Sequence, residues 1–177
     1  VLNGTVHALE PAPDGSRLYI AGAFTTLNGA GRSRLAAIDP ATGATMTGYL
    51  PAVGGGAIRS IVLRGSTLYL GGNFSSVGGL TRTRLAAFDL ATRTISSTWT
   101  PAAGGNAVLT LEMAPDGSRL YVGGRFSSIN GSTAAAWIAA LDPVTGAVIP
   151  AFAARPGREV FDILADDRGL VWTALGG

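Results

Sequence analysis

The sequence predicts an all-β chain built from a repeat of about fifty residues. Similar segments place phenylalanines at Phe24, Phe74 and Phe126, which lie 50 and 52 residues apart. Glycine (26) and proline (9) together make up about a fifth of the 177 residues. Frequent Gly and Pro divide a chain into short segments joined by turns. The spacing and the composition therefore favour many short strands over long helices.

Three further landmarks recur with the same period and in the same order. An apolar segment ending in Asp occurs at Leu35–Asp39, Leu85–Asp89 and Ile138–Asp142. A proline follows each one, at Pro51, Pro101 and Pro150. The opening segments begin at Val6, Ile58, Val108 and Val160. The chain therefore holds three complete repeats, at residues 1–51, 52–101 and 102–151, and the first half of a fourth, at 152–177.

Within the first repeat, four strands are expected at residues 6–12, 17–24, 34–38 and 44–50. The Asp14-Gly15 pair suits the tight turn after the first strand. The second strand is apolar on both faces, as in a strand between two sheets. A polar loop at 25–33 leads to the third strand. The fourth alternates weakly and ends at Pro51, which suits an outer edge.

Four short antiparallel strands per repeat, with a turn every few residues, are typical of a β-propeller blade. The sequence thus predicts three complete four-stranded blades plus an inner half blade. A propeller needs about four to eight blades to close. We therefore expect part of a larger propeller, with the rest of the parent chain as one partner. The alternative is a fragment whose remainder is disordered or removed. Two copies joined head to tail would still lack outer strands.

The segments that carry a family resemblance start at Pro13, Leu68 and Pro115. They read PDGSRLYIAGAFTTLNG, LYLGGNFSSVGG and PDGSRLYVGGRFSSING. They resemble the delta-60 β-propeller repeat of bacterial extracellular proteins, over nearly the whole chain. The second repeat departs from the pattern at 64–66 and the third at 134–137. The resemblance implies secretion or surface display and a scaffolding or ligand-binding role, with no enzymatic residues to carry over.

Two weaker resemblances concern single features. The segment AAIDPATG at 36–43 is similar to blades of quinoprotein dehydrogenases. The order of strands and turns is similar to WD-type blades, although the Trp-Asp dipeptide is missing. Neither resemblance supplies a cofactor site.

Charge and composition exclude several partners. All 13 basic side chains are Arg, against 11 acidic ones, and the net charge is +2. No basic run supplies a phosphate-binding footprint, so nucleic acid is not expected. No apolar stretch is long enough to cross a membrane as a helix, so membrane insertion is not expected either. Cys is absent, which removes disulfides and thiolate metal ligands.

Catalytic, metal and cofactor sites are not expected. His7 is the only histidine, and no Ser-His-Asp or paired-His spacing surrounds it. Asp39, Asp89 and Asp142 stand singly rather than in a calcium-loop pattern. We expect each to accept hydrogen bonds from the backbone of the turn that follows it.

The candidate ligand-binding residues are Arg32, Arg34, Arg82 and Arg84. Equivalent positions of adjacent blades lie side by side, so these arginines predict a basic rim for a protein or an acidic glycan. The competing interpretation is that they are solvated residues at the start of the third strand, each pairing locally with a carboxylate. The third repeat has Ala134–Ala136 in this region, which interrupts the series.

Aromatic residues divide into two groups. The residues that recur at one place in every repeat predict packing between blades: Phe24, Phe74, Phe126, Tyr19, Tyr69 and Tyr121. Trp99, Trp137 and Trp172 fall at different places, and we expect at least one to be exposed, where it offers a stacking surface for a sugar.

Three functions remain open from the sequence. The first is a non-catalytic binding or scaffolding module, extracellular or at the cell surface, that presents the loops at 25–33, 75–83 and 127–136. The second is a structural component that assembles with itself. The third is an accessory propeller of a secreted enzyme whose catalytic domain lies outside this chain.

Overall fold

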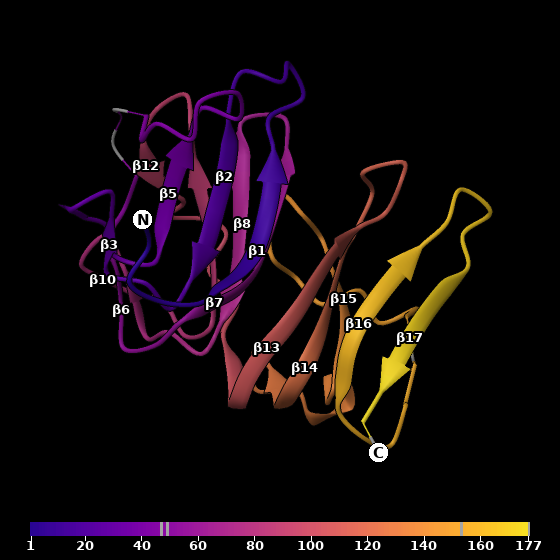
Figure 1. The fold of residues 1–177 in the computed structure, drawn as a ribbon. Helices are drawn as coiled ribbons and strands as arrows, with labels where there is room; N and C mark the ends of the chain where they lie inside the picture. Colours follow the sequence, from indigo (N-terminus) through magenta and orange to yellow (C-terminus); the bar gives the residue numbers. More distant parts are fainter. Residues whose placement is uncertain (47, 49, 153, 177) are drawn as a thin grey trace.

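A computed structural model describes residues 1–46, 48, 50–152 and 154–176. Every element in these ranges is a strand except the single-turn 3₁₀ helix η1 (Thr133–Ala135). Antiparallel pairing joins the strands into separate small sheets that stand side by side (Figure 1). The all-β architecture predicted from the repeat is confirmed.

Four main sheets follow the repeats, and we number them in chain order. The first contains β1 (Val6–Pro11), β2 (Leu18–Gly22) and β5 (Leu35–Ile38). The second contains β7 (Ile58–Arg64), β8 (Thr67–Gly72), β11 (Leu85–Asp89) and β12 (Thr94–Ile95). The third contains β13 (Ala103–Met113), β14 (Leu120–Ile129) and β15 (Ile138–Leu141). The fourth contains β16 (Val160–Ala165) and β17 (Val171–Leu175).

The outermost strand is shorter than expected. Among the described residues, only the second sheet has a fourth strand, β12, and it spans two residues. In the first and third sheets a single bridge takes its place, between Ile38 and Thr45 and between Leu141 and Val148. Of the expected strand at 44–50, the described residues show that bridge, and 47 and 49 lie outside the described residues.

The polar loops of the first two repeats are hairpins, and in the third a single bridge joins Ile129 and Ser132 before η1. In the first repeat β3 (Thr26–Leu27) pairs with β4 (Ala30–Gly31). In the second, β9 (Ser76–Val77) pairs with β10 (Leu80–Thr81) and with β6 (Val53–Gly54). The first turn consists of Asn28 and Gly29, at φ 51° and 81°. Two consecutive positive φ values are typical of the two-residue hairpin turn that Asn-Gly favours. The first loop thus forms a hairpin of its own between the paired strands β2 and β5.

Aromatic residues at the repeated positions form the core between sheets. Innermost strands contact one another in the order β1, β7, β13 and β16. Phe24, Phe74 and Phe126 are buried. Tyr19, Tyr69 and Tyr121 are buried as well. The predicted packing between blades is confirmed for five of these residues, which lie in clusters shared by two sheets. Phe24 is the exception, because its cluster contains residues of the first repeat alone.

Each innermost strand carries a β-bulge at the same position. The register shifts between Val6 and Ala8, and likewise at the matching place in β7, β13 and β16. Opposite three of these bulges lies a glycine: Gly22, Gly72 or Gly124. A Cβ atom at Gly72 would overlap the carbonyl oxygen of Ala57. The repeat needs glycine there because the two backbones approach closely.

The close approach predicts that Gly72→Ala destabilises the protein by about 2–3 kcal/mol, because backbone must shift to admit one methyl group. The matched control is Gly31→Ala, since Gly31 is exposed and has open space around its Cβ position. Urea unfolding followed by tryptophan fluorescence measures both variants. Equal stability of Gly72→Ala and Gly31→Ala would contradict the close-approach explanation.

Candidate functional site

Two of the four candidate arginines connect neighbouring sheets. Arg34 donates through Nη1 to the carbonyl oxygen of Val53. Arg84 donates through Nη1 to the carbonyl oxygen of Ala103 at 2.7 Å, and through Nε to that of Asn106 at 2.7 Å. Val53 and Ala103 open the following repeat. Each guanidinium therefore holds the start of the next repeat against its own sheet.

The backbone conformation at Arg34 and Arg84 directs both side chains toward the next repeat. Arg34 and Arg84 adopt φ values of 69° and 67°, in the left-handed region that non-glycine residues rarely occupy. Trp137 has φ 67° just before β15, the same place in the third repeat. Such a conformation persists when surrounding contacts determine it. The shared geometry marks a structural position of the repeat.

The other two candidate arginines bond to carbonyls of their own repeat. Arg32 donates through Nη1 to the carbonyl oxygen of the adjacent Gly31 at 2.8 Å. Arg82 donates to the carbonyl oxygens of Thr81 and Ser96, both at 2.8 Å. Its Nε is buried and has no hydrogen-bond partner among the described residues. Among the described residues, the side chains of Arg32 and Arg34 each make one hydrogen bond, but that of Arg32 is to the adjacent residue, so its guanidinium is not held by another repeat.

We call the hydrogen bonds of Arg34 and Arg84 to the next repeat arginine clamps. We predict that Arg84→Ala lowers the free energy of unfolding by about 1–3 kcal/mol, because two charge-assisted hydrogen bonds to carbonyls are lost. Arg32→Ala is the control, since its bond joins adjacent residues and links no sheets. Thermal unfolding by circular dichroism compares the two variants. A larger loss for Arg32→Ala would contradict the role assigned to Arg84.

The three repeated aspartates cap turns, as predicted. Oδ1 of Asp39 accepts hydrogen bonds from the backbone N–H groups of Ala41 and Thr42, at 2.8 and 3.1 Å. Asp89 and Asp142 make the same pair of contacts with the residues two and three positions further on, at 2.8 Å each. The N–H donors lower the pKa of Asp89 and Asp142 below the usual value.

Because the pKa of Asp142 is lowered, the stability that its carboxylate contributes depends on pH. The carboxylate of Asp142 stabilises the fold above its unfolded pKa of about 3.8, and this contribution disappears as pH falls through the lower folded value. We predict that Asp142→Asn is less stable than the wild type at neutral pH, and that the difference shrinks in acid. Asp167→Asn is the control, because no hydrogen bond to Asp167 occurs within the described ranges. Urea unfolding across a pH series tests this, and a pH-independent difference would contradict it.

Polar side chains also connect the innermost strands. Arg59 Nη1 lies 3.2 Å from His7 Nε2. Burial and the charge of Arg59 lower the pKa of His7, which favours the neutral ring. Oε1 of Glu10 accepts the backbone N–H of Leu63 at 2.9 Å. Burial raises the pKa of Glu10, and the charge of Glu112 adds to the increase. His7 is thus a structural residue between two sheets.

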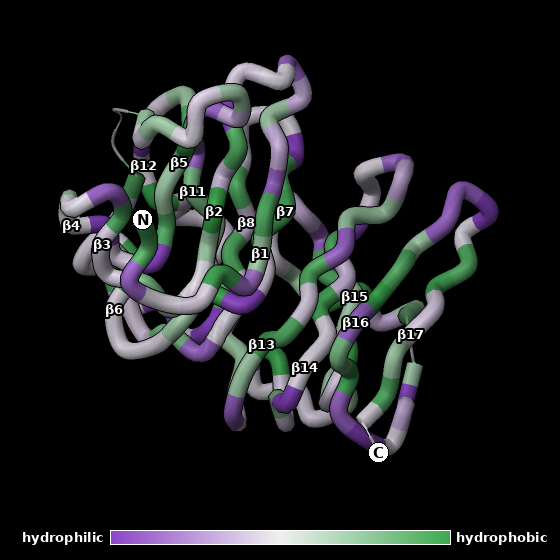
Figure 2. Tube along the Cα trace, in the orientation of Figure 1, coloured by the Kyte–Doolittle hydropathy of each residue, from purple (hydrophilic) through white to green (hydrophobic). Residues whose placement is uncertain are grey.

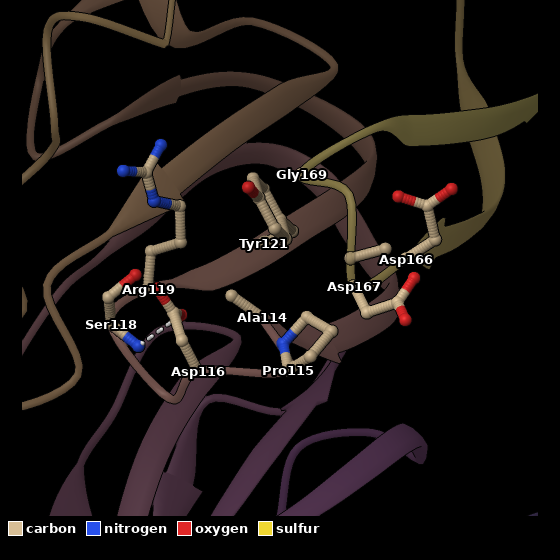
Figure 3. A pocket seen from close by; sticks show the side chains of 10 residues that line it. Ala114, Pro115, Asp116, Ser118, Arg119, Tyr121, Asp166, Asp167 and Gly169 are labelled. Atoms are coloured by element: carbon tan, nitrogen blue, oxygen red, sulfur yellow. Dashed lines mark hydrogen bonds between the residues drawn. The ribbon is translucent and has the colours of Figure 1, made fainter.

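A polar cavity of about 300 Å³ lies between the hairpin turns of the third and fourth sheets (Figure 3). Asp116 accepts the backbone N–H of Ser118 at 2.9 Å. Asp166 accepts that of Leu170 at 2.9 Å and forms an ion pair with Arg168. These two carboxylates hold their own turns, so they do not converge on a common point for a ligand.

A second cavity, of about 360 Å³, lies between the second and third sheets, with Tyr69 and Trp99 in its lining. The two rings pack edge to face, with centroids 5.1 Å apart. The Tyr69 hydroxyl donates to the carbonyl of Pro143 at 2.7 Å, and Trp99 Nε1 to that of Asp142 at 3.2 Å. Trp99 is buried, so its ring joins two sheets instead of offering a stacking surface for a sugar.

Within residues 1–46, 48, 50–152 and 154–176, no group of three His, Cys, Asp or Glu side chains is arranged to hold a metal ion. The described chain also contains no helix of the length and apolarity that a membrane span requires.

Comparison with known proteins identifies a fold. No protein-family model and no curated protein matches the sequence. Many solved structures match the architecture. One is described as the extracellular domain of a hybrid two-component system from B. thetaiotaomicron, with a TM-score of 0.59 and 14% identity, covering 97% of this chain and 20% of that one.

Two other solved structures, which carry different descriptions, also match. A chain of the mitotic checkpoint complex matches with a TM-score of 0.60 and 14% identity over 96% of this chain and 47% of its own. Hydrazine synthase of Kuenenia stuttgartiensis matches with a TM-score of 0.57 and 16% identity, over 95% of this chain and 40% of its own. The chain therefore spans less than half the length of each of these three chains. Similarity at this level of identity shows the fold, and the chain is an all-β array of β-propeller sheets.

Proposed function

We propose that the chain is a non-catalytic β-propeller module that binds or scaffolds other molecules outside the cell or at its surface. The observation that carries the proposal is the repeated hairpin loop. Three loops follow the second main strand of successive sheets. Figure 1 places β3 of the first loop near β10 of the second loop. Loops held by a rigid scaffold are the usual carriers of recognition.

The loops are held firmly and yet expose their tips. In the third repeat, the side chain of Asn130 accepts the N–H of Ala102 at 2.9 Å and donates to the carbonyl of Gly146 at 3.2 Å. The tips at 28–31, 78–81 and 130–134 are exposed. A pre-ordered loop loses little conformational entropy on binding, which favours affinity.

Arg32 gives the first loop a preference for acidic partners, either a protein or an anionic glycan. The resemblance to delta-60 repeats and the fold shared with a bacterial extracellular domain support a location outside the cell. The proposal depends mainly on the loops.

The test is binding of the 177-residue chain to poly(glycerol phosphate) at low salt, with neutral dextran as reference, by isothermal titration calorimetry. We predict that Arg32→Glu weakens binding about threefold to tenfold, which corresponds to one lost exposed ion pair and one repulsion. Arg17→Glu is the matched control, because Arg17 is exposed in the hairpin turn between β1 and β2, away from the loops.

An equal effect of both variants would show attraction by net charge alone. Absence of binding to the acidic polymer would overturn the preference for an anionic glycan.

A second function, a structural component that assembles with itself, is favoured by a different observation. Large hydrophobic side chains are exposed in both outer sheets: Leu9 in the first sheet, and Leu164 and Trp172 in the fourth.

A further inference from the structure

The β-bulge of each innermost strand turns one side chain out of the core. The residue that the register skips is His7 in β1, Arg59 in β7, Leu109 in β13 and Phe161 in β16. We call these four the bulge residues. Each is at least partly exposed, whereas Ile58, just before Arg59, is fully buried. Because bulges re-aim side chains and each innermost strand is the edge of its sheet, the bulge residues lie along these inner edges.

Arg59 is the charged member of this set, and its partner is neutral. Its Nη1 lies 3.2 Å from Nε2 of His7. Because a guanidinium only donates hydrogen bonds, Nε2 accepts in this contact, and His7 is neutral when it does so. In the described part of the chain, no acidic side chain forms an ion pair with Arg59. The positive charge of this half-buried side chain is thus left without a counter-charge, which is costly.

The guanidinium of Arg59 also keeps N–H groups for a ligand. Its Nε is buried and has no hydrogen-bond partner among the described residues. Because Nε is turned into the protein and Nη1 contacts His7, the donors that remain are Nη2 and the second hydrogen of Nη1. Charge-assisted hydrogen bonds from arginine to carboxylate or phosphate oxygens are among the strongest in proteins. The free donors therefore suit an anion with oxygen atoms.

Equivalent positions of neighbouring innermost strands lie level with one another. Arg59 contacts His7, and Oγ1 of Thr110 donates to Asp162 at 3.2 Å, each pair being one repeat apart. The innermost strands therefore begin at one end of the array, which we call the basic end. Figure 2 shows hydrophobic residues along β2, β7 and β8, with hydrophilic residues toward the strand ends.

Arginines gather at the basic end. The third strands begin there, because the carbonyl oxygens of Arg34 and Arg84 accept the N–H groups of the glycines opposite the bulges. The other arginines that precede or follow strands at this end are Arg32, Arg82, Arg125 and Arg158. An end rich in positive charge attracts anions and raises their local concentration.

The nearest acidic side chains are already engaged elsewhere. Glu159 forms an ion pair with Arg125, and Asp162 accepts the hydrogen bond of Thr110. On the strands that flank Arg59, Glu10 and Glu112 lie three residues beyond the bulge residue. Each of these glutamates accepts a backbone N–H of the following sheet. Arg59 is therefore left to an anion from outside the chain.

We propose that Arg59 and His7 form a binding site for an oxyanion, the carboxylate or phosphate group of a ligand that approaches from the basic end. The guanidinium of Arg59 binds the anion, which supplies the counter-charge that the protein does not. His7 is a positioning residue, because its Nε2 holds the guanidinium at the inner edge.

The surroundings of this site are complete within the chain. β7 contacts β1 on one side and β13 on the other. In a closed propeller the innermost strands surround a central channel, so the inner edge of β7 still faces that channel when further blades complete the ring. The site lies apart from the loop tips proposed for ligand binding and does not rest on that proposal, so either can fail alone.

The experiment is an NMR titration of the imidazole signal. The chain has one histidine, so this signal reports His7 alone. Burial and the charge of Arg59 lower the pKa of His7, and an anion bound to Arg59 offsets that charge. Added inorganic phosphate or glucuronate, at constant ionic strength, is therefore expected to raise the pKa of His7 until binding saturates. By linkage, either anion binds more tightly as pH falls through that pKa.

Three variants separate the roles of the residues. Arg59→Gln is expected to raise the pKa of His7 without any anion and to weaken phosphate binding about tenfold or more. His7→Gln keeps a neutral acceptor for Arg59, so phosphate binding, followed by backbone amide shifts, is expected to persist but to lose its pH dependence. Arg17→Gln is the control with the same change of charge, since Arg17 lies in the turn between β1 and β2, away from the basic end.

A response to phosphate alone assigns a phosphate group, a response to glucuronate alone assigns a carboxylate, and a response to both supports the shared chemistry. The wild-type titration needs no variant, so misfolding of Arg59→Gln would not hide the result. Absence of a saturable response to both anions would overturn the proposal. So would an undiminished phosphate response in Arg59→Gln, or an equal loss in Arg17→Gln. Binding to His7→Gln that still depends on pH would overturn the role of His7.

Discussion

The packing of one branched side chain onto one small residue, repeated from sheet to sheet, is the constraint on which the rest of the structure depends. Ile61, Leu111 and Ile163 reach the preceding sheet because that sheet has Ala or Gly beneath them. The bulge in each innermost strand and the glycine opposite it set the local path of that strand. Arginine clamps and turn-capping aspartates then fix the segments that enter and leave each sheet.

Much of this architecture could be predicted from the sequence, because a repeated position can be identified without knowing its partner. The strands expected at 6–12, 17–24 and 34–38 lie close to β1, β2 and β5. The hairpin in each polar loop had a readable signal in the two-residue turns Asn28-Gly29, Gly78-Gly79 and Asn130-Gly131. The outermost strand was overestimated because weak alternation gives no measure of how far pairing extends.

The candidate site could be predicted less well, since arginine has the same appearance in a sequence whether it binds a ligand or a backbone carbonyl. The clamps of Arg34 and Arg84 depend on a positive φ and on carbonyls some twenty residues away in the next repeat. The exposure of Trp172 follows from the sheet arrangement, because the same position is buried wherever another sheet follows. Such features require knowledge of which sheets are neighbours.

The serial arrangement of the sheets also has a thermodynamic consequence. In an array whose units contact only their neighbours, stability is approximately a sum of unit and junction contributions. Within these 177 residues the fourth sheet has two strands and the second has four, so fewer strand pairings hold β16 and β17. Local opening therefore costs least at β16 and β17, so their amide hydrogens would exchange with solvent sooner than those of β8. An interaction that covers this end would slow that exchange and make the array more cooperative.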